Sequence, residues 1–70
     1  MDPIIDRLRE KWPQREGKFR RLLETDDFDK IDEAWPEISE MAQAMVDEID
    51  HEFEDTPIID LVDAAEEYLT

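Results

Sequence analysis

The chain has 70 residues, no cysteine, and a net charge of −14 from 22 acidic and eight basic residues. These values allow one small domain over residues 1–70, exclude disulfides and thiolate chemistry, and argue against direct binding of nucleic acid, whose phosphates would be repelled. Hydrophobic residues make up 40% of the chain, too many for a disordered acidic tail, while no apolar run approaches the length of about 18 residues that a membrane span needs.

The first expected helix covers residues 3–12. Asp2 can accept hydrogen bonds from free backbone N–H groups, and the proline after it suits the first helical position. Pro13 ends or kinks this helix because it lacks an N–H group and restricts the residue before it. The N-terminal sequence has neither the basic start nor the apolar block of a signal peptide, so we expect a cytoplasmic protein.

A second helix is expected over residues 14–24, although Gly17 weakens its first turn. Basic side chains gather between Arg7 and Arg21, so that residues 1–22 carry a net charge of +3 and residues 23–70 a net charge of −17. The basic cluster has two possible uses: contact with phosphate, or pairing with the acidic remainder within the fold or across a dimer. No recognition helix with groove-reading residues stands out, so the sequence favours pairing.

The third expected helix, residues 27–54, carries the most regular pattern of the chain. Its hydrophobic residues recur at alternating steps of three and four and therefore line one face of an α-helix. Pro36 interrupts the pattern, so that either a helix ends at Ala34 and another begins, or one long helix kinks. The register continues through the proline, which favours the second arrangement. This apolar stripe, expected to form a core or dimer surface, consists of Phe28, Ile31, Trp35, Ile38, Met45, Ile49 and Phe53.

Glu52 is an anomaly in the apolar stripe, because it falls between Ile49 and Phe53. Either the stripe ends there, or Glu52 meets a basic residue of the first helices or of a second chain. The stripe is also longer than the short first helices can cover, and burial against a twin chain is the simplest completion. We therefore expect a homodimer.

The other side of the same helix is acidic, with carboxylates that repeat every seven residues, about 10 Å apart. Residues 28–55 hold eleven acidic residues and one basic residue. The density is about one charge per 4 Å of helix, close to the spacing of roughly 3.4 Å between the phosphates of one DNA strand. This acidic ridge, the expected partner-binding surface, comprises Glu33, Glu40, Asp47 and Glu54, flanked by Asp29, Glu37 and Asp50.

The last expected helix covers residues 57–69 and follows a second start signal at Thr56-Pro57. Hydrophobic residues from Ile58 to Leu69 share one of its sides. The other side is again acidic, and no strand pattern appears in the sequence. The expected fold is therefore all-α, a small bundle of three to four helices with a long central helix. The acidic residues of the last helix are Asp60, Asp63, Glu66 and Glu67.

Few residues suggest chemistry. Glu48 and His51 form half of the carboxylate–histidine motif of di-iron bundles, which a homodimer would double, but the register turns both toward water. The acidic runs at residues 27–32 and 50–55 lack the glycine and terminal glutamate of a calcium loop. Ser39, the only serine, has no base nearby. We therefore expect no enzyme, no cofactor and no metal site, and a metal-binding dimer is a minor alternative.

Three explanations of the acidity compete. In the first, the acidic ridge imitates nucleic acid and docks on a basic or nucleic-acid-binding protein, as do small phage-encoded inhibitors of restriction or CRISPR systems, which resemble this chain in charge and not in sequence. Alternatively, a homodimeric structural or assembly protein uses its charge only for solubility. The third explanation is a halophilic origin. Stability at low salt separates the third from the other two.

Overall fold

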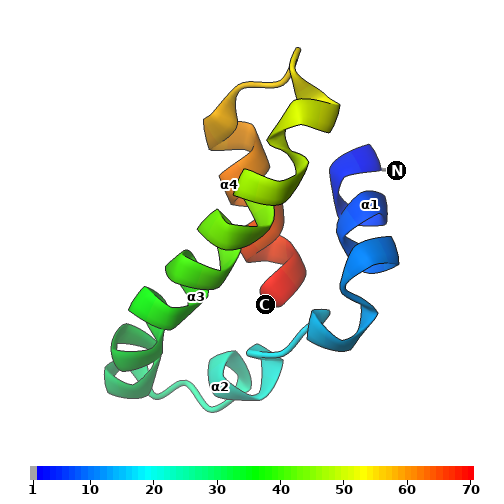
Figure 1. Ribbon diagram of the computed structural model, residues 1–70. Coiled ribbons are helices and arrows are strands. Elements are labelled where there is room, and N and C mark those ends of the chain that lie inside the picture. Colours follow the sequence, from blue (N-terminus) through cyan, green and yellow to red (C-terminus); the bar gives the residue numbers. More distant parts are fainter. Residues whose placement is uncertain (1) are drawn as a thin grey trace.

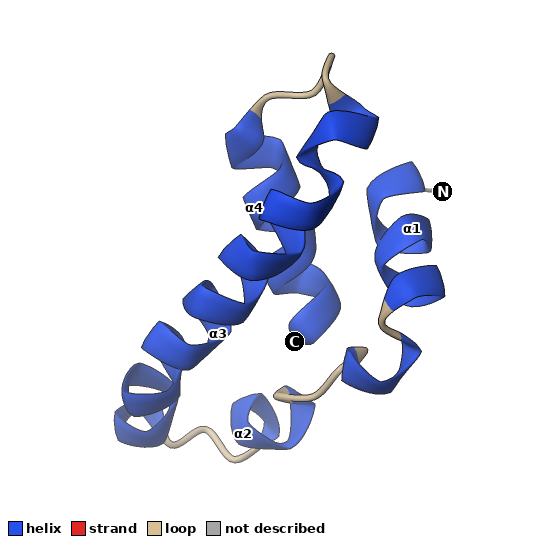
Figure 2. Cartoon of the chain, viewed as in Figure 1, coloured by secondary structure: helices blue, strands red, loops and turns tan. Residues whose placement is uncertain are grey.

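The computed structural model describes residues 2–70, in which it contains four α-helices, two short 3₁₀ helices and no strand (Figures 1 and 2). The expected all-α fold with a long central helix is confirmed. The helices are α1 (Pro3–Lys11), η1 (Pro13–Arg15), α2 (Arg20–Glu24), α3 (Phe28–Ile49), η2 (Asp50–Phe53) and α4 (Ile58–Leu69).

The beginning of α1 follows the expected capping chemistry. An Asp2 carboxylate oxygen accepts a hydrogen bond from the N–H group of Ile4 at 3.0 Å, and α1 ends immediately before Trp12 and Pro13. The start of α4 lies where the sequence places it, but no side chain caps it. The proline before Ile58 therefore marks this helix start without a capping hydrogen bond from Thr56.

The expected helix over residues 14–24 is wrong in its first half, because only the short η1 and α2 form there. Gly17 separates them in the left-handed region, with φ of +67°. The N–H group of Gly17 donates to the carbonyl oxygen of Tyr68 at 2.9 Å. The N–H group of Phe19 donates to the carbonyl oxygen of Leu69, also at 2.9 Å. This segment therefore satisfies the last carbonyl groups of α4 instead of building a helix of its own.

The central helix α3 passes through Pro36 without a break, as the continuous register predicts. Asp27 caps its start by accepting a hydrogen bond from the N–H group of Lys30 at 3.3 Å. Pro36 is exposed, so water can reach the carbonyl group that the proline leaves unpaired. The helix ends at Ile49 and tightens into η2, so the expected extension to residue 54 as one α-helix is wrong.

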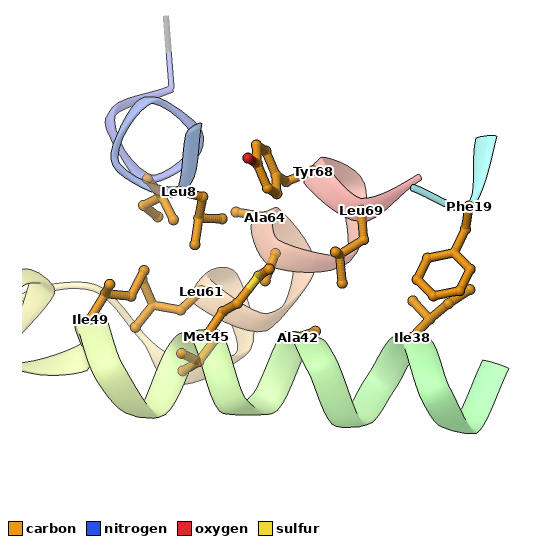
Figure 3. Close-up of a cluster of buried hydrophobic side chains, with 13 residues drawn as sticks. Leu8, Phe19, Ile38, Ala42, Met45, Ile49, Leu61, Ala64, Tyr68 and Leu69 are labelled. Carbon is orange, nitrogen blue, oxygen red and sulfur yellow. The ribbon is translucent and has the colours of Figure 1, made fainter. Parts of the chain in front are cut away.

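The hydrophobic core lies between α3 and α4, with α1 and Phe19 closing it from two further sides (Figure 3). Ile38, Met45 and Ile49 of the apolar stripe are buried there, as predicted. Phe53 is partly buried and packs against the same core. The core residues of the other segments are Ile4, Leu8, Phe19, Leu61, Ala64, Ala65, Tyr68 and Leu69.

The first turns of α3 extend beyond the C-terminal end of α4 (Figure 1). At 1.5 Å per residue α3 is roughly 33 Å long and α4 roughly 18 Å, so α4 cannot cover the whole stripe. Phe28 is 75% exposed and Trp35 43% exposed, and Ile31 is only partly buried. Placing Phe28 and Trp35 in the core of this chain is therefore wrong. The expected homodimer stays a prediction, and α4 removes the need for a second chain over Ile38 to Ile49.

Candidate protein-binding surface

All seven carboxylates of the acidic ridge are exposed. At 3.6 residues per turn, Glu33, Glu40 and Asp47 project from the side of α3 opposite the buried Ile38 and Ile49. Their charges therefore stand away from the core, and the fold does not depend on them. Asp29 and Glu37 lie on α3 as well, whereas Asp50 belongs to η2 and Glu54 to the turn after it. The ridge is thus straight only from Glu33 to Asp47.

The acidic ridge has few basic neighbours within the chain. Lys18 Nζ lies 3.9 Å from a carboxylate oxygen of Glu37, and His51 Nδ1 lies 4.0 Å from one of Asp50. Asp47 accepts a hydrogen bond from Gln43 Nε2 at 3.1 Å, which leaves its charge in place. No other ion pair within residues 2–70 involves the ridge. Most of its negative charge is therefore available to a partner.

The basic cluster of the N-terminal segment pairs mainly with acidic groups near α1. Arg9 binds both carboxylate oxygens of Glu16, with Nη2 to Oε1 at 2.9 Å, and Arg9 Nη1 lies 3.5 Å from Asp6. The guanidinium of Arg9 lowers the pKa of the Glu16 carboxyl mainly through this hydrogen bond. The predicted pairing of the basic cluster is therefore confirmed for part of it. Three arginines, Arg15, Arg20 and Arg21, form no ion pair within residues 2–70.

Glu52 meets a basic residue of the first helix, one of the two alternatives for this anomaly. Arg7 donates two hydrogen bonds to its carboxylate, and Lys11 Nζ lies 4.0 Å away. The hydrogen bond from Arg7 is the main cause that lowers the pKa of the Glu52 carboxyl. Glu52 thus links η2 to α1 through this ion pair. Its negative charge is neutralised within the chain and does not add to the candidate surface.

The residues considered for chemistry do not come together. Glu48 and His51 are both exposed, and residues 2–70 bring together no group of three or more potential metal-ligating side chains. No charged side chain among these residues is buried, so no carboxylate has the apolar surroundings that a general acid needs. A hollow of about 330 Å³ beside η1 is lined without a carboxylate, by Lys11, Trp12, Pro13, Gln14 and Arg15.

Exposed hydrophobic residues are the feature that the sequence did not reveal. Phe28 and Trp35 lie at the start of α3, whereas Ile58 and Ile59, 61% and 68% exposed, lie at the start of α4. Ile58 was expected on the buried side of its helix, and that expectation is wrong. The start of α3 and the start of α4 lie at opposite ends of the molecule (Figure 1). Only the relative lengths of the packed helices reveal which apolar residues stay uncovered.

Comparisons with protein-family models, with curated proteins and with solved structures found no match for this chain. None of the helices within residues 2–70 combines the length and apolar character needed to cross a membrane. Evidence on the function therefore comes from the charge and shape of the surface.

Proposed function

We propose that this chain is a non-catalytic binding module whose acidic ridge docks on a basic surface of a partner protein. The observation that carries the proposal is the row formed by Glu33, Glu40 and Asp47. These carboxylates are exposed, aligned on the side of α3 away from the core, and without a basic partner within residues 2–70. A rigid helix presents them at a fixed spacing of about 10 Å.

The spacing of charge along α3 favours a partner that ordinarily binds nucleic acid. A Lys- or Arg-rich groove built for a phosphate backbone can accept a similar density of carboxylates without a large change of shape. The field of the ridge would also accelerate encounter, since steering raises association rates between opposite charges. Occupation of that groove by the chain would inhibit the partner, as a nucleic-acid mimic does.

The experiment reverses Glu33, Glu40 and Asp47 to Lys together. A nucleic-acid-binding protein captured with the native chain and then purified serves as the partner. We expect the association rate to fall and its salt dependence to flatten, with helicity unchanged by circular dichroism. Reversal of Asp60, Asp63 and Glu67 on α4, which are also exposed, changes the net charge equally and is the matched control.

Two outcomes decide against the proposal. Equal losses from the ridge and α4 variants would show that only the net charge matters. Unchanged binding by the folded ridge variant would move the function to another surface. Mimicry has its own test: duplex DNA should compete with the chain for the purified partner, and simultaneous binding of both would exclude a shared groove.

A second candidate function is a homodimeric assembly protein whose acidity serves only solubility. The exposed Phe28 and Trp35 favour it, because large aromatic side chains at a surface often mark an association site. The mass in dilute solution at moderate salt tests this candidate, which requires a dimer and no basic partner. A halophilic origin of the acidity additionally requires that the chain unfold at low salt.

A further inference from the structure

The start of α3 exposes two aromatic residues next to acidic ones. Phe28 and Trp35 are seven residues apart, two turns of helix, and their side chains therefore project from neighbouring positions about 10 Å apart. They are the only aromatic residues of the described chain that are exposed. Figure 1 shows this end of α3 beyond the reach of α1 and α4.

A carboxylate neighbours both aromatic residues on the helix surface. Asp32 follows Phe28 by four residues and precedes Trp35 by three, the separations at which side chains are neighbours on a helix surface. Asp29, three residues before Asp32, borders the same strip, whereas Glu33 projects from another side of the helix; all three acidic residues are exposed. None of them forms an ion pair within residues 2–70. The strip therefore offers two apolar anchors with unneutralised negative charge beside them.

We propose that this aromatic strip, defined by Phe28, Asp32 and Trp35, docks a basic amphipathic helix of a partner protein. The inference rests on the proposed function, because it names the apolar anchor that accompanies the charged contact. A partner helix lying along α3 presents apolar residues two turns apart at the same spacing of about 10 Å, and a Lys or Arg between them reaches Asp32. Trp is among the residues that most often dominate the binding free energy of an interface.

Charge decides between this occupant and a second copy of the chain. Residues 26–33 contain five acidic residues and one basic residue, Lys30. Two copies pairing through the aromatic strip would bring both acidic sets together, and each chain already carries a net charge of −14. Like charges opposed at an interface cost binding free energy, whereas a cationic helix removes the repulsion.

The test uses a synthetic peptide of about 18 residues, made of leucine and lysine in helical register, as the probe. A scrambled peptide of the same composition keeps the charge and loses the apolar face. Affinity is measured for the native chain, for the F28A/W35A variant and for the I58A/I59A variant. The I58A/I59A variant is the matched control, because it removes two other exposed apolar residues from an end of the molecule that is also acidic.

We expect F28A/W35A to lose about tenfold or more in affinity for the amphipathic peptide, and I58A/I59A to stay within about twofold. In a Trp12→Phe background Trp35 is the only tryptophan, and its emission should shift to the blue when the amphipathic peptide binds. The D32N variant should lose several-fold, with a reduced salt dependence. Circular dichroism checks that each variant is folded.

Three results would overturn the inference: equal losses in the two alanine variants, equal binding of the scrambled peptide, or a native dimer that F28A/W35A dissociates, which would place a second copy on the strip. The proposed function is assessed separately with Glu40 and Asp47 reversed to Lys. A loss in that variant without a loss in F28A/W35A overturns the aromatic anchor alone. If F28A/W35A loses affinity and the variant with Glu40 and Asp47 reversed to Lys does not, the aromatic anchor stands and the charged contact lies outside the ridge.

Discussion

The guanidinium of Arg7 and the carboxylate of Glu52 form two hydrogen bonds, of 2.7 and 3.0 Å, between residues 45 positions apart in the sequence. This bidentate pair joins α1 to η2, at the point where α3 has ended and the apolar stripe is interrupted. Of the two alternatives that the sequence leaves open for Glu52, the second therefore holds: a basic residue of the first helix binds it, and the stripe continues beyond it, because Phe53 still packs against the core.

The first prediction concerns this pair. The E52Q variant should melt a few degrees below the native chain, because Arg7 loses a charged, bidentate partner. The E10Q variant is the control, since Glu10 contacts the same arginine from the next turn of α1 at 3.3 Å with a 72% exposed side chain. It should have little effect. The R7E/E52R charge swap should recover part of the stability, and a swap no better than R7E alone would contradict the assignment.

The second prediction concerns acid. The pKa values of Glu16 and Glu52 are lowered by their arginine partners, so these pairs contribute stability that is present above the ordinary carboxyl pKa and lost as pH falls through the lowered values. Repulsion among the unpaired carboxylates acts in the opposite direction and is relieved as they protonate. The melting temperature should therefore rise on mild acidification from neutral pH and fall at lower pH. E52Q should weaken the fall, and an unchanged acid limb in that variant would contradict the prediction.

The third prediction concerns alkali. Tyr68 is the only tyrosine, is 3% exposed, and donates a hydrogen bond to the carbonyl of Trp12. Burial raises the pKa of its phenol. A raised folded pKa gives stability that is complete below the unfolded pKa and lost as pH rises through the folded value. The phenolate absorbance should therefore appear above the ordinary pKa of about 10, together with loss of helicity. Titration at the ordinary value by a chain that stays helical would contradict this prediction.

Much of the fold follows from local patterns. Asp2, Asp27 and the prolines locate the starts of α1, α3 and α4, and the seven-residue register carries α3 through Pro36. The side of α3 that bears the acidic ridge follows from the same register. These features depend on residues within a few positions of one another, which a sequence displays directly.

The remaining features depend on distant parts of the chain. The second helix is short because the segment around Gly17 binds carbonyl groups at the end of α4, some 50 positions later. Phe28 and Trp35 match the buried residues of the stripe in periodicity, and their exposure follows only from where α4 ends. The ridge bends after Asp47 because α3 gives way to η2 before Glu54. Periodicity predicts which residues share a side of a helix, and not whether another element covers that side.

The fourth prediction tests Gly17. Its φ of +67° suits glycine, and a methyl group at its Cβ position would meet the Arg20 side chain at 3.4 Å, an ordinary contact. The G17A variant should therefore lose about 1 kcal/mol of folding free energy from backbone strain alone, equivalent to roughly 4–8 °C in melting temperature. Asn tolerates the left-handed region better, so G17N should lose less. Equal losses in both variants would indicate a steric origin instead.

The last prediction concerns salt. Only six of the 22 acidic residues pair with a basic group within residues 2–70, and residues 23–70 carry a net charge of −17. Salt screens the repulsion among them, and it screens the exposed Arg9–Glu16 pair as well, but the unpaired charges are far more numerous. The melting temperature should therefore rise from low to molar salt. Reversal of Glu33, Glu40 and Asp47 to Lys should raise the melting temperature at low salt and flatten its salt dependence, because it replaces repulsion on α3 with attraction. A native melting temperature that does not respond to salt would show that the fold already neutralises its own charge, and would leave the ridge without the free field that the proposed function requires.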